Sequence, residues 1–238
     1  MISRSFVPWF AVLSVIGWMF PVRAATPLPS WYGQRDTTRQ GYEFTSGSLT
    51  PLPNIAENPY QVSMATVVLG SFSDGWQEPG NLPWPAVNDL NGINNDGAWD
   101  IGVAGAITVQ CKVAANPPPP GMFYRIDFQV YVVAYRGITA LPNFDSQGLM
   151  AEDLALTQST VGPDPFFPGA TWEGRNWTGS FNNVSTNVVS FGITAPTINI
   201  TVVDTMEVFT RATLVPEPSV SGLWMMAVSA LIWRRRRF

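Results

Sequence analysis

Histidine is absent from this 238-residue chain, lysine occurs once, as Lys112, and charged residues make up only 13% of the sequence. Without histidine the chain cannot build a Ser-His-Asp or Cys-His catalytic arrangement, or a zinc site of the histidine type. With so few basic side chains and a net charge of −4, it lacks the basic surface that nucleic-acid binding requires. These absences exclude the commonest hydrolases and the nucleic-acid-binding proteins.

Cysteine is nearly absent as well. Because Cys111 is the one cysteine, no disulfide can form within the chain. In the stretch AITVQCKV it shares one strand face with Ile107, Val109 and Val113. That pattern predicts a small buried apolar side chain rather than a reactive thiol.

Residues 1–24 are predicted to be a secretory signal peptide. Arg4 supplies a positive charge, residues 6–20 are largely apolar, and Val22 and Ala24 place small residues at the −3 and −1 positions of a signal-peptidase site. Pro8 and Pro21 argue against the alternative, a first helix of the core. Signal peptidase would therefore cut after Ala24 and leave an exported domain at residues 25–214.

The last 24 residues, 215–238, combine three features. The apolar run 220–233 would measure about 21 Å as a helix, short against a hydrocarbon layer of roughly 30 Å. Four arginines follow it and would stay on the cytoplasmic side as a membrane stop. An extended strip precedes it, because two prolines prevent the helix from continuing backwards. The strip is Val215, Pro216, Glu217, Pro218 and Ser219, and the stop is Arg234, Arg235, Arg236 and Arg237.

This order of strip, short apolar helix and arginine cluster resembles the PEP-CTERM sorting signal, whose tail is also catalogued as an "ice-binding protein C-terminal domain". The resemblance covers about a tenth of the chain and carries no indication of ice binding. It implies an exosortase as partner, a membrane enzyme that recognises the strip at residues 215–219. It also implies export in a Gram-negative bacterium, passage through the inner membrane, and delivery to the cell surface or extracellular matrix. A plain tail anchor is the alternative.

The part between the two signals shows a period of two, which is typical of β-strands. Strands are predicted at 123–136, 106–113, 58–70 and 187–194, with a last strand at 197–211 that has one face in and one face out. In this last strand Val202 and Met206 share the apolar face and Glu207 lies on the polar face, and the alternation is broken only at Asp204. The loops between them are rich in Pro, Gly and Asn, and only 146–156 offers a short helix. We therefore expect an all-β fold, a β-sandwich of jelly-roll type.

Catalysis by a carboxylate pair stays open as an alternative. A glycosidase needs two Asp or Glu side chains across a sugar cleft, and Asp100, Asp127 and Glu173 are candidates. A chain with this many carboxylates always offers some pair, so the signal is weak. A solvated strand face is the more economical interpretation of Asp127.

The stretch NDLNGINNDGAWD suggests a metal site. Asp89 and Asn91 fit the first and third positions of an EF-hand loop, but Ile93 and Asn94 occupy positions that need an oxygen ligand and a glycine. As an EF-hand it fails. A looser Ca²⁺ site, with the candidate ligands Asp89, Asn91, Asn95 and Asp96, stays open beside the alternative of a plain turn-rich loop.

Tryptophan provides the other functional hint. Trp172 and Trp177 are expected on either side of a turn at Gly174, where exposed rings would stack on sugars. The alternative is that both rings pack at the ends of the core. The sequence as a whole predicts a non-enzymatic, exported surface or matrix protein, structural or in contact with exopolysaccharide, without a required cofactor. A secreted carbohydrate-active enzyme is the alternative.

Overall fold

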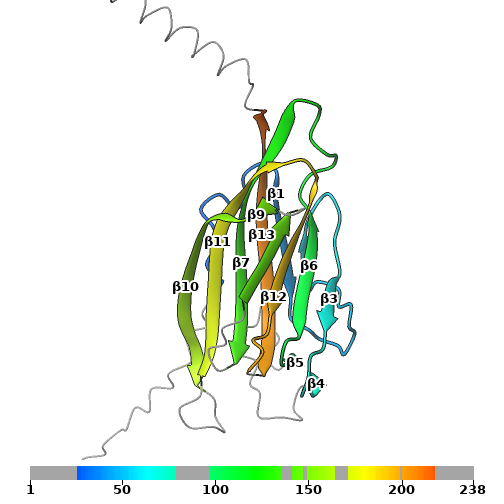
Figure 1. Ribbon diagram of the computed structural model, residues 1–238, viewed down its shortest axis with the longest axis vertical. Helices are drawn as coiled ribbons and strands as arrows, with labels where there is room; N and C mark the ends of the chain where they lie inside the picture. The colour runs from blue at the N-terminus through cyan, green and yellow to red at the C-terminus, as the bar shows by residue number, and fades with distance from the viewer. Residues whose placement is uncertain are drawn as a thin grey trace, which may run out of the picture.

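The computed structural model describes residues 26–78, 97–135, 141–146, 149–163, 171–198 and 200–217. Within these ranges all the regular secondary structure is β-strand. The strands form two antiparallel sheets (Figure 1). Sheet A has eight strands and sheet B has five. The prediction of an all-β fold is confirmed, and the arrangement is sandwich-like, whereas the finer jelly-roll assignment stays a prediction.

Both sheets join segments that are distant in the sequence. Sheet A runs in the order β10 (Glu152–Pro163), β11 (Thr171–Val184), β7 (Met122–Tyr135), β13 (Thr201–Pro216), β1 (Thr37–Tyr42) and β2 (Ile55–Glu57), with β5 (Ala98–Gly102) beside β13 and β4 (Gly75–Gln77) beside β5. Sheet B runs in the order β3 (Ala65–Val68), β6 (Ala106–Lys112), β12 (Val188–Thr194), β8 (Leu141–Ser146) and β9 (Leu149–Met150).

Several strands match the sequence closely. The alternation at 123–136 becomes β7, the stretch at 106–113 becomes β6, and 187–194 becomes β12. The stretch 58–70 yields only the short β3. The short helix considered at 146–156 was wrong: apart from Ala151, its described residues belong to strands β8, β9 and β10. Pairing to β11 decided the conformation where local preference was weak.

The core lies between the two sheets. From sheet B it receives one face of β6, on which Ile107, Val109 and Cys111 are all fully buried. From sheet A it receives the even-numbered side chains of β7, such as Ile126 and Phe128. We call the side of sheet A that faces sheet B its inner face and the opposite side its outer face. The predicted burial of Cys111 is confirmed.

Strand β13 departs from its predicted pattern. The alternation in the sequence is interrupted at Asp204, and the structure has a β-bulge there, between Val203 and Thr205. A bulge adds one residue to the strand and exchanges its two faces. Val203 therefore lies in the inner core together with Met206, whereas Val202, predicted to share a face with Met206, lies on the outer face.

The outer face of β13 is not solvated, contrary to the expected one face in and one face out. Residues 201–210 are buried on both sides. Over Glu207 and Phe209 the cover is an N-terminal segment, residues 26–36, which crosses the outer face of sheet A. We call this segment the strap. Its Tyr32 ring packs edge-on against Phe209 at a centroid distance of 5.4 Å, and its Pro27 carbonyl accepts a hydrogen bond from Gln129 of β7.

The chain leaves the sandwich at the end of β13. That strand continues past residue 214, the expected end of the domain, to Pro216, which pairs with Met122 at the start of β7. The Glu217 N–H then donates to the Gly121 carbonyl at 2.9 Å. No helix in the described ranges is long and apolar enough to cross a membrane. Residues 1–24 and the predicted helix 220–233 lie outside the described part.

Candidate functional site

An open groove of about 830 Å³ lies near the end of the sandwich at which β13 finishes. Its walls come from three separate parts of the chain. One wall is the end of the strap at 34–36, another is Tyr60 with the proline-rich loop 114–119, and the third is the β7–β13 pair at Tyr124 and 211–214. The groove exists only because the fold brings these three parts of the chain together.

Local hydrogen bonds position Tyr60 at the groove. The Asn58 side-chain oxygen accepts from the Tyr60 N–H at 3.0 Å, while its amide donates to the Lys112 carbonyl at 3.0 Å. The Tyr60 hydroxyl donates to Asp36 at 2.9 Å. Burial raises the pKa of Tyr60, and the hydrogen bond to Asp36 raises it further, so the phenol stays neutral at physiological pH.

Tyr124 belongs to the third wall. It lies near the start of β7, and its hydroxyl donates to the Asn116 carbonyl in the proline-rich loop at 3.1 Å. Burial raises the pKa of Tyr124, with a smaller contribution from the charge of Asp36. The two tyrosines thus link the groove to the strap and to the loop through neutral hydroxyls.

Arg211 of β13 lines the groove and also a second, shallower depression of about 440 Å³. Its guanidinium donates to Asp127 at 2.6 Å and to the Gln34 side chain at 2.8 Å, and it lies over the Trp31 ring at 5.5 Å from the centroid. Arg125 donates to the other oxygen of Asp127 at 3.0 Å. Arg211 is therefore held in one orientation by the strap and by β7.

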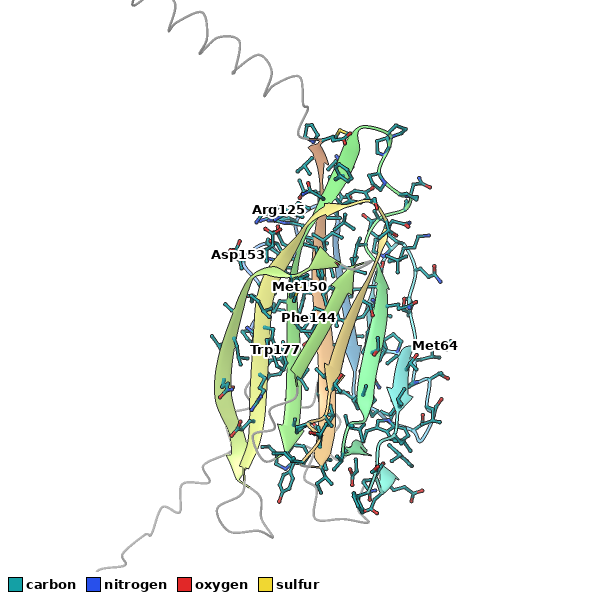
Figure 2. The ribbon with its side chains drawn as sticks, in the orientation of Figure 1. Met64, Arg125, Phe144, Met150, Asp153 and Trp177 are labelled. Carbon is teal, nitrogen blue, oxygen red and sulfur yellow. The ribbon has the colours of Figure 1, made fainter. Side chains whose placement is uncertain are left out.

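The two carboxylates of the shallower depression are Asp127 and Asp153. Figure 2 shows Arg125 and Asp153 on β7 and β10, on the same side of the molecule. Both oxygens of Asp127 already accept from guanidinium groups, so neither is free to approach a glycosidic oxygen. The interpretation of Asp127 as a solvated strand residue was incomplete, because its side chain is only 15% exposed and is ion-paired.

The other predicted carboxylates also have structural partners. Asp100 in β5 accepts from the Gly102 N–H at 2.8 Å and the Asp74 N–H at 3.3 Å, and burial raises its pKa. Glu173 in β11 lies 3.7 Å from the Arg175 guanidinium. The depression at Asp127 is lined by neither Asp100 nor Glu173, so the structure does not assemble the candidates into one site.

Both tryptophans that were considered for sugar stacking are buried. Trp172 is 0% exposed and Trp177 is 2% exposed, so neither offers a ring face to a sugar. Both rings are packed inside the protein, as the alternative interpretation expected. Their predicted turn is absent, because Gly174 lies within the continuous strand β11, where a Cβ would collide with the Tyr131 hydroxyl. Along a strand, residues five apart point to opposite faces. Trp177 accordingly packs edge-on against Phe144 in the inner core, where Figure 2 shows the two rings, while Trp172 belongs to the outer cluster with Tyr135.

Two other predicted sites lie outside the described residues in whole or in part. The candidate calcium ligands Asp89, Asn91, Asn95 and Asp96, and the tail from Pro218 through Ser219 to Arg237, are outside. In the part that the structure describes, no group of three His, Cys, Asp or Glu side chains has an arrangement that suits a metal ion. Within the sorting strip, Val215 and Pro216 pair with β7, and Pro216 and Glu217 are exposed.

The groove residues were not identified from the sequence. The sequence pattern places Arg211 only at the end of a strand and Tyr60 only within a strand, although the Asn58–Tyr60 turn is visible as Asn-Pro-Tyr. A comparison with protein-family models, curated proteins and solved structures found no match to this chain. The fold and the groove together define an all-β, sandwich-like protein with an open site of mixed aromatic and polar lining.

Proposed function

We propose that the chain is an exported surface or extracellular-matrix protein, sorted through a PEP-CTERM-type tail, that contacts exopolysaccharide without enzymatic activity. Signal peptidase and an exosortase are its processing partners. The sequence of the two termini supports the export and sorting part. The exposed, extended Pro216 and Glu217 at the end of β13 support it too, because a processing enzyme grips an extended strip.

The groove is the single observation that carries the glycan contact. Sugars bind to sites that combine an aromatic face with fixed hydrogen-bond donors and acceptors. Here the half-buried Tyr60 provides the ring, Gln34 and Arg211 provide amide and guanidinium groups, and Asp36 provides a carboxylate. The groove replaces Trp172 and Trp177 as the proposed contact, because those rings are buried.

Depletion from solution by the exopolysaccharide of the exporting host tests this proposal. Truncating Tyr60 to alanine removes one stacking contact of about 1 kcal/mol. Because a loss of that size corresponds to roughly a five- to tenfold change in Kd, we expect binding to weaken by about that factor. Tyr60→Phe keeps the ring and should retain most of the binding. Phe72→Ala is the matched control, since Phe72 is 84% exposed but precedes β4 and does not line the groove.

Unchanged binding in Tyr60→Ala would show that the groove is not the contact. The same incubation is assayed for new reducing ends. Their appearance, together with their loss in Asp127→Asn or Asp153→Asn, would favour the carbohydrate-active enzyme, since these two carboxylates share the shallower depression. Depletion without new reducing ends favours the binding protein.

A further inference from the structure

Among the strands that the structure describes, β10 is the long open edge of the sandwich. It contains 12 residues and pairs on one side with β11, and in Figure 1 it lies at the left margin of the sheets. The other edge strands of the described sheets, β2, β3, β4 and β9, contain 3, 4, 3 and 2 residues. Proteins keep their sheet edges short or blunted because an open edge pairs with other chains. β10 departs from that rule.

From 152 to 159 the side chains of β10 are exposed on both faces. Residues 152–159 are all exposed, whereas a strand covered on one face would alternate. Leu156 pairs with Trp177 and so points to the inner face, yet it is 44% exposed, and Leu154 is 46% exposed. Met150, next to the start of β10, is 86% exposed. Sheet B does not extend far enough to cover this edge.

The middle of β10 has no charged residue that would prevent pairing. Glu152 and Asp153 stand at its start, and from Leu154 to Pro163 there is no Lys, Arg, Asp or Glu. Between two β-bulges, Ala155 to Thr160 keep a regular register with β11. This regular stretch of exposed, uncharged backbone is suited to antiparallel strand addition.

We infer that two copies of this chain pair edge to edge through β10, antiparallel, around a two-fold axis near Leu156 and Thr157. This geometry places the acidic start of each strand opposite the uncharged 159–162 of its partner, whereas a parallel pairing would place Glu152 and Asp153 beside their own copies. It also brings the Leu154 and Leu156 side chains of both copies to one face, because opposite residues share a face. The partner is a second copy because, about this axis, the regular uncharged stretch from Ala155 to Thr160 faces the same stretch of its copy and no like charges meet.

Site-specific crosslinking in intact exporting cells tests the pairing. Cys111 is fully buried and its pKa is raised to about 12 by burial, so the native chain provides a silent background. Single cysteines are placed at each position from Leu154 to Thr160 in the full chain, and a mild oxidant is added. We expect disulfide-linked dimers to peak near Leu156 or Thr157, where the Cα atoms of the two copies lie at about 4.5–5.5 Å, within disulfide range.

Mass spectrometry of the crosslinked peptides identifies the partner. A β10 peptide joined to the same β10 peptide supports the inference, and a β10 peptide joined to another protein overturns it. Gln110→Cys is the control position, since Gln110 is exposed but lies on β6, which is paired on both sides. Absence of a crosslink at every position from Leu154 to Thr160 also overturns the inference.

A matched pair of charge substitutions separates pairing from folding. In the Thr157→Cys background, Gln158→Lys places a positive charge beside the axis in both copies and should lower the crosslink yield about tenfold. Gln110→Lys makes the same exchange at an exposed position on β6, a strand inside sheet B, and should leave the yield unchanged. Equal yields from the two variants would contradict edge pairing, and this outcome is independent of whether the groove binds glycan.

Discussion

At the scale of single residues, the clearest departure from the sequence pattern is Glu207. The alternation on β13 placed it on a solvated face, but its side chain is fully buried beneath the strap. Arg39 of β1 donates to it and lies over the Phe209 ring at 5.4 Å from the centroid. Burial raises the pKa of Glu207, and the partly compensating Arg39 lowers it.

The pH dependence of stability follows from that raised pKa. Below the unfolded pKa both states hold the proton. As the pH rises through the interval up to the folded pKa, the unfolded state loses its proton first, so the free energy of unfolding falls. We therefore expect Glu207→Gln to gain stability relative to the native chain as the pH rises above about 4.5, the ordinary pKa of a glutamate, measured by urea unfolding.

Glu57→Gln is the control for this prediction. Glu57 is an exposed carboxylate that lies 3.7 Å from the same Arg39. Glu57→Gln therefore removes a carboxylate beside Arg39 without removing a buried one, which separates the effect of burial from the effect of losing the charge. A stability difference between Glu207→Gln and the native chain that does not change with pH would contradict the assignment.

At the scale of elements, the strap and the bulge determine what the sandwich exposes. The bulge at Asp204 exchanges the faces of β13, and the strap then covers the face that the exchange leaves outward. Trp31 and Tyr32, neighbours on the strap, lie over Arg211 and Arg39 respectively. The strap thus shields the Arg39–Glu207 ion pair on the outer face. Its end at residues 34–36 also forms one wall of the groove.

Shortening a strap side chain should loosen this cover. Tyr32 packs against Phe209 and donates to Glu57, so Tyr32→Ala is expected to destabilise the domain by about 1–2 kcal/mol. Hydrogen exchange should increase at β1 and β13 before it increases at β6. Tyr32→Phe, which keeps the ring, should cost less than half as much. Equal protection of all strands in Tyr32→Ala would show that the strap only lies on the surface.

At the scale of the whole molecule, the folded part and the sorting strip meet at Pro216. The last sheet pair joins Pro216 to Met122, and the Glu217 N–H binds the Gly121 carbonyl. A cut at or after Pro218 would keep every one of these contacts, whereas a cut before Pro216 would remove strand pairs. Residues 215–217 of the strip would therefore stay attached to the folded domain after a cut near Pro218, where we expect cleavage.

Intact mass and fractionation from the native host check the processing. We expect a mature form that begins near Ala25, ends near Pro218 and lies outside the inner membrane, because the extended strip reaches the sorting enzyme while the sandwich stays folded. A form that still carries Arg234–Arg237 in the inner membrane would contradict sorting and would make the tail a plain anchor.

The sequence by itself determined three central strands and the part of the inner core that they carry. Hydrophobic side chains at a period of two placed β6, β7 and β12 and buried Cys111, because a strand with one apolar face must bury it. The same local pattern marked the irregularity at Asp204. It did not say that the irregularity is a bulge, because a bulge is defined by the partner strand.

Only the tertiary structure decided the site. The groove joins Tyr60, Tyr124 and Arg211, which are distant in the sequence, and no local spacing encodes their meeting. Likewise, the burial of Trp172 and Glu207 depends on what covers the outer face of sheet A. Burial by a distant segment leaves no periodic trace in the strand that it covers, so the sequence predicted which residues alternate and the fold decided which of them meet solvent.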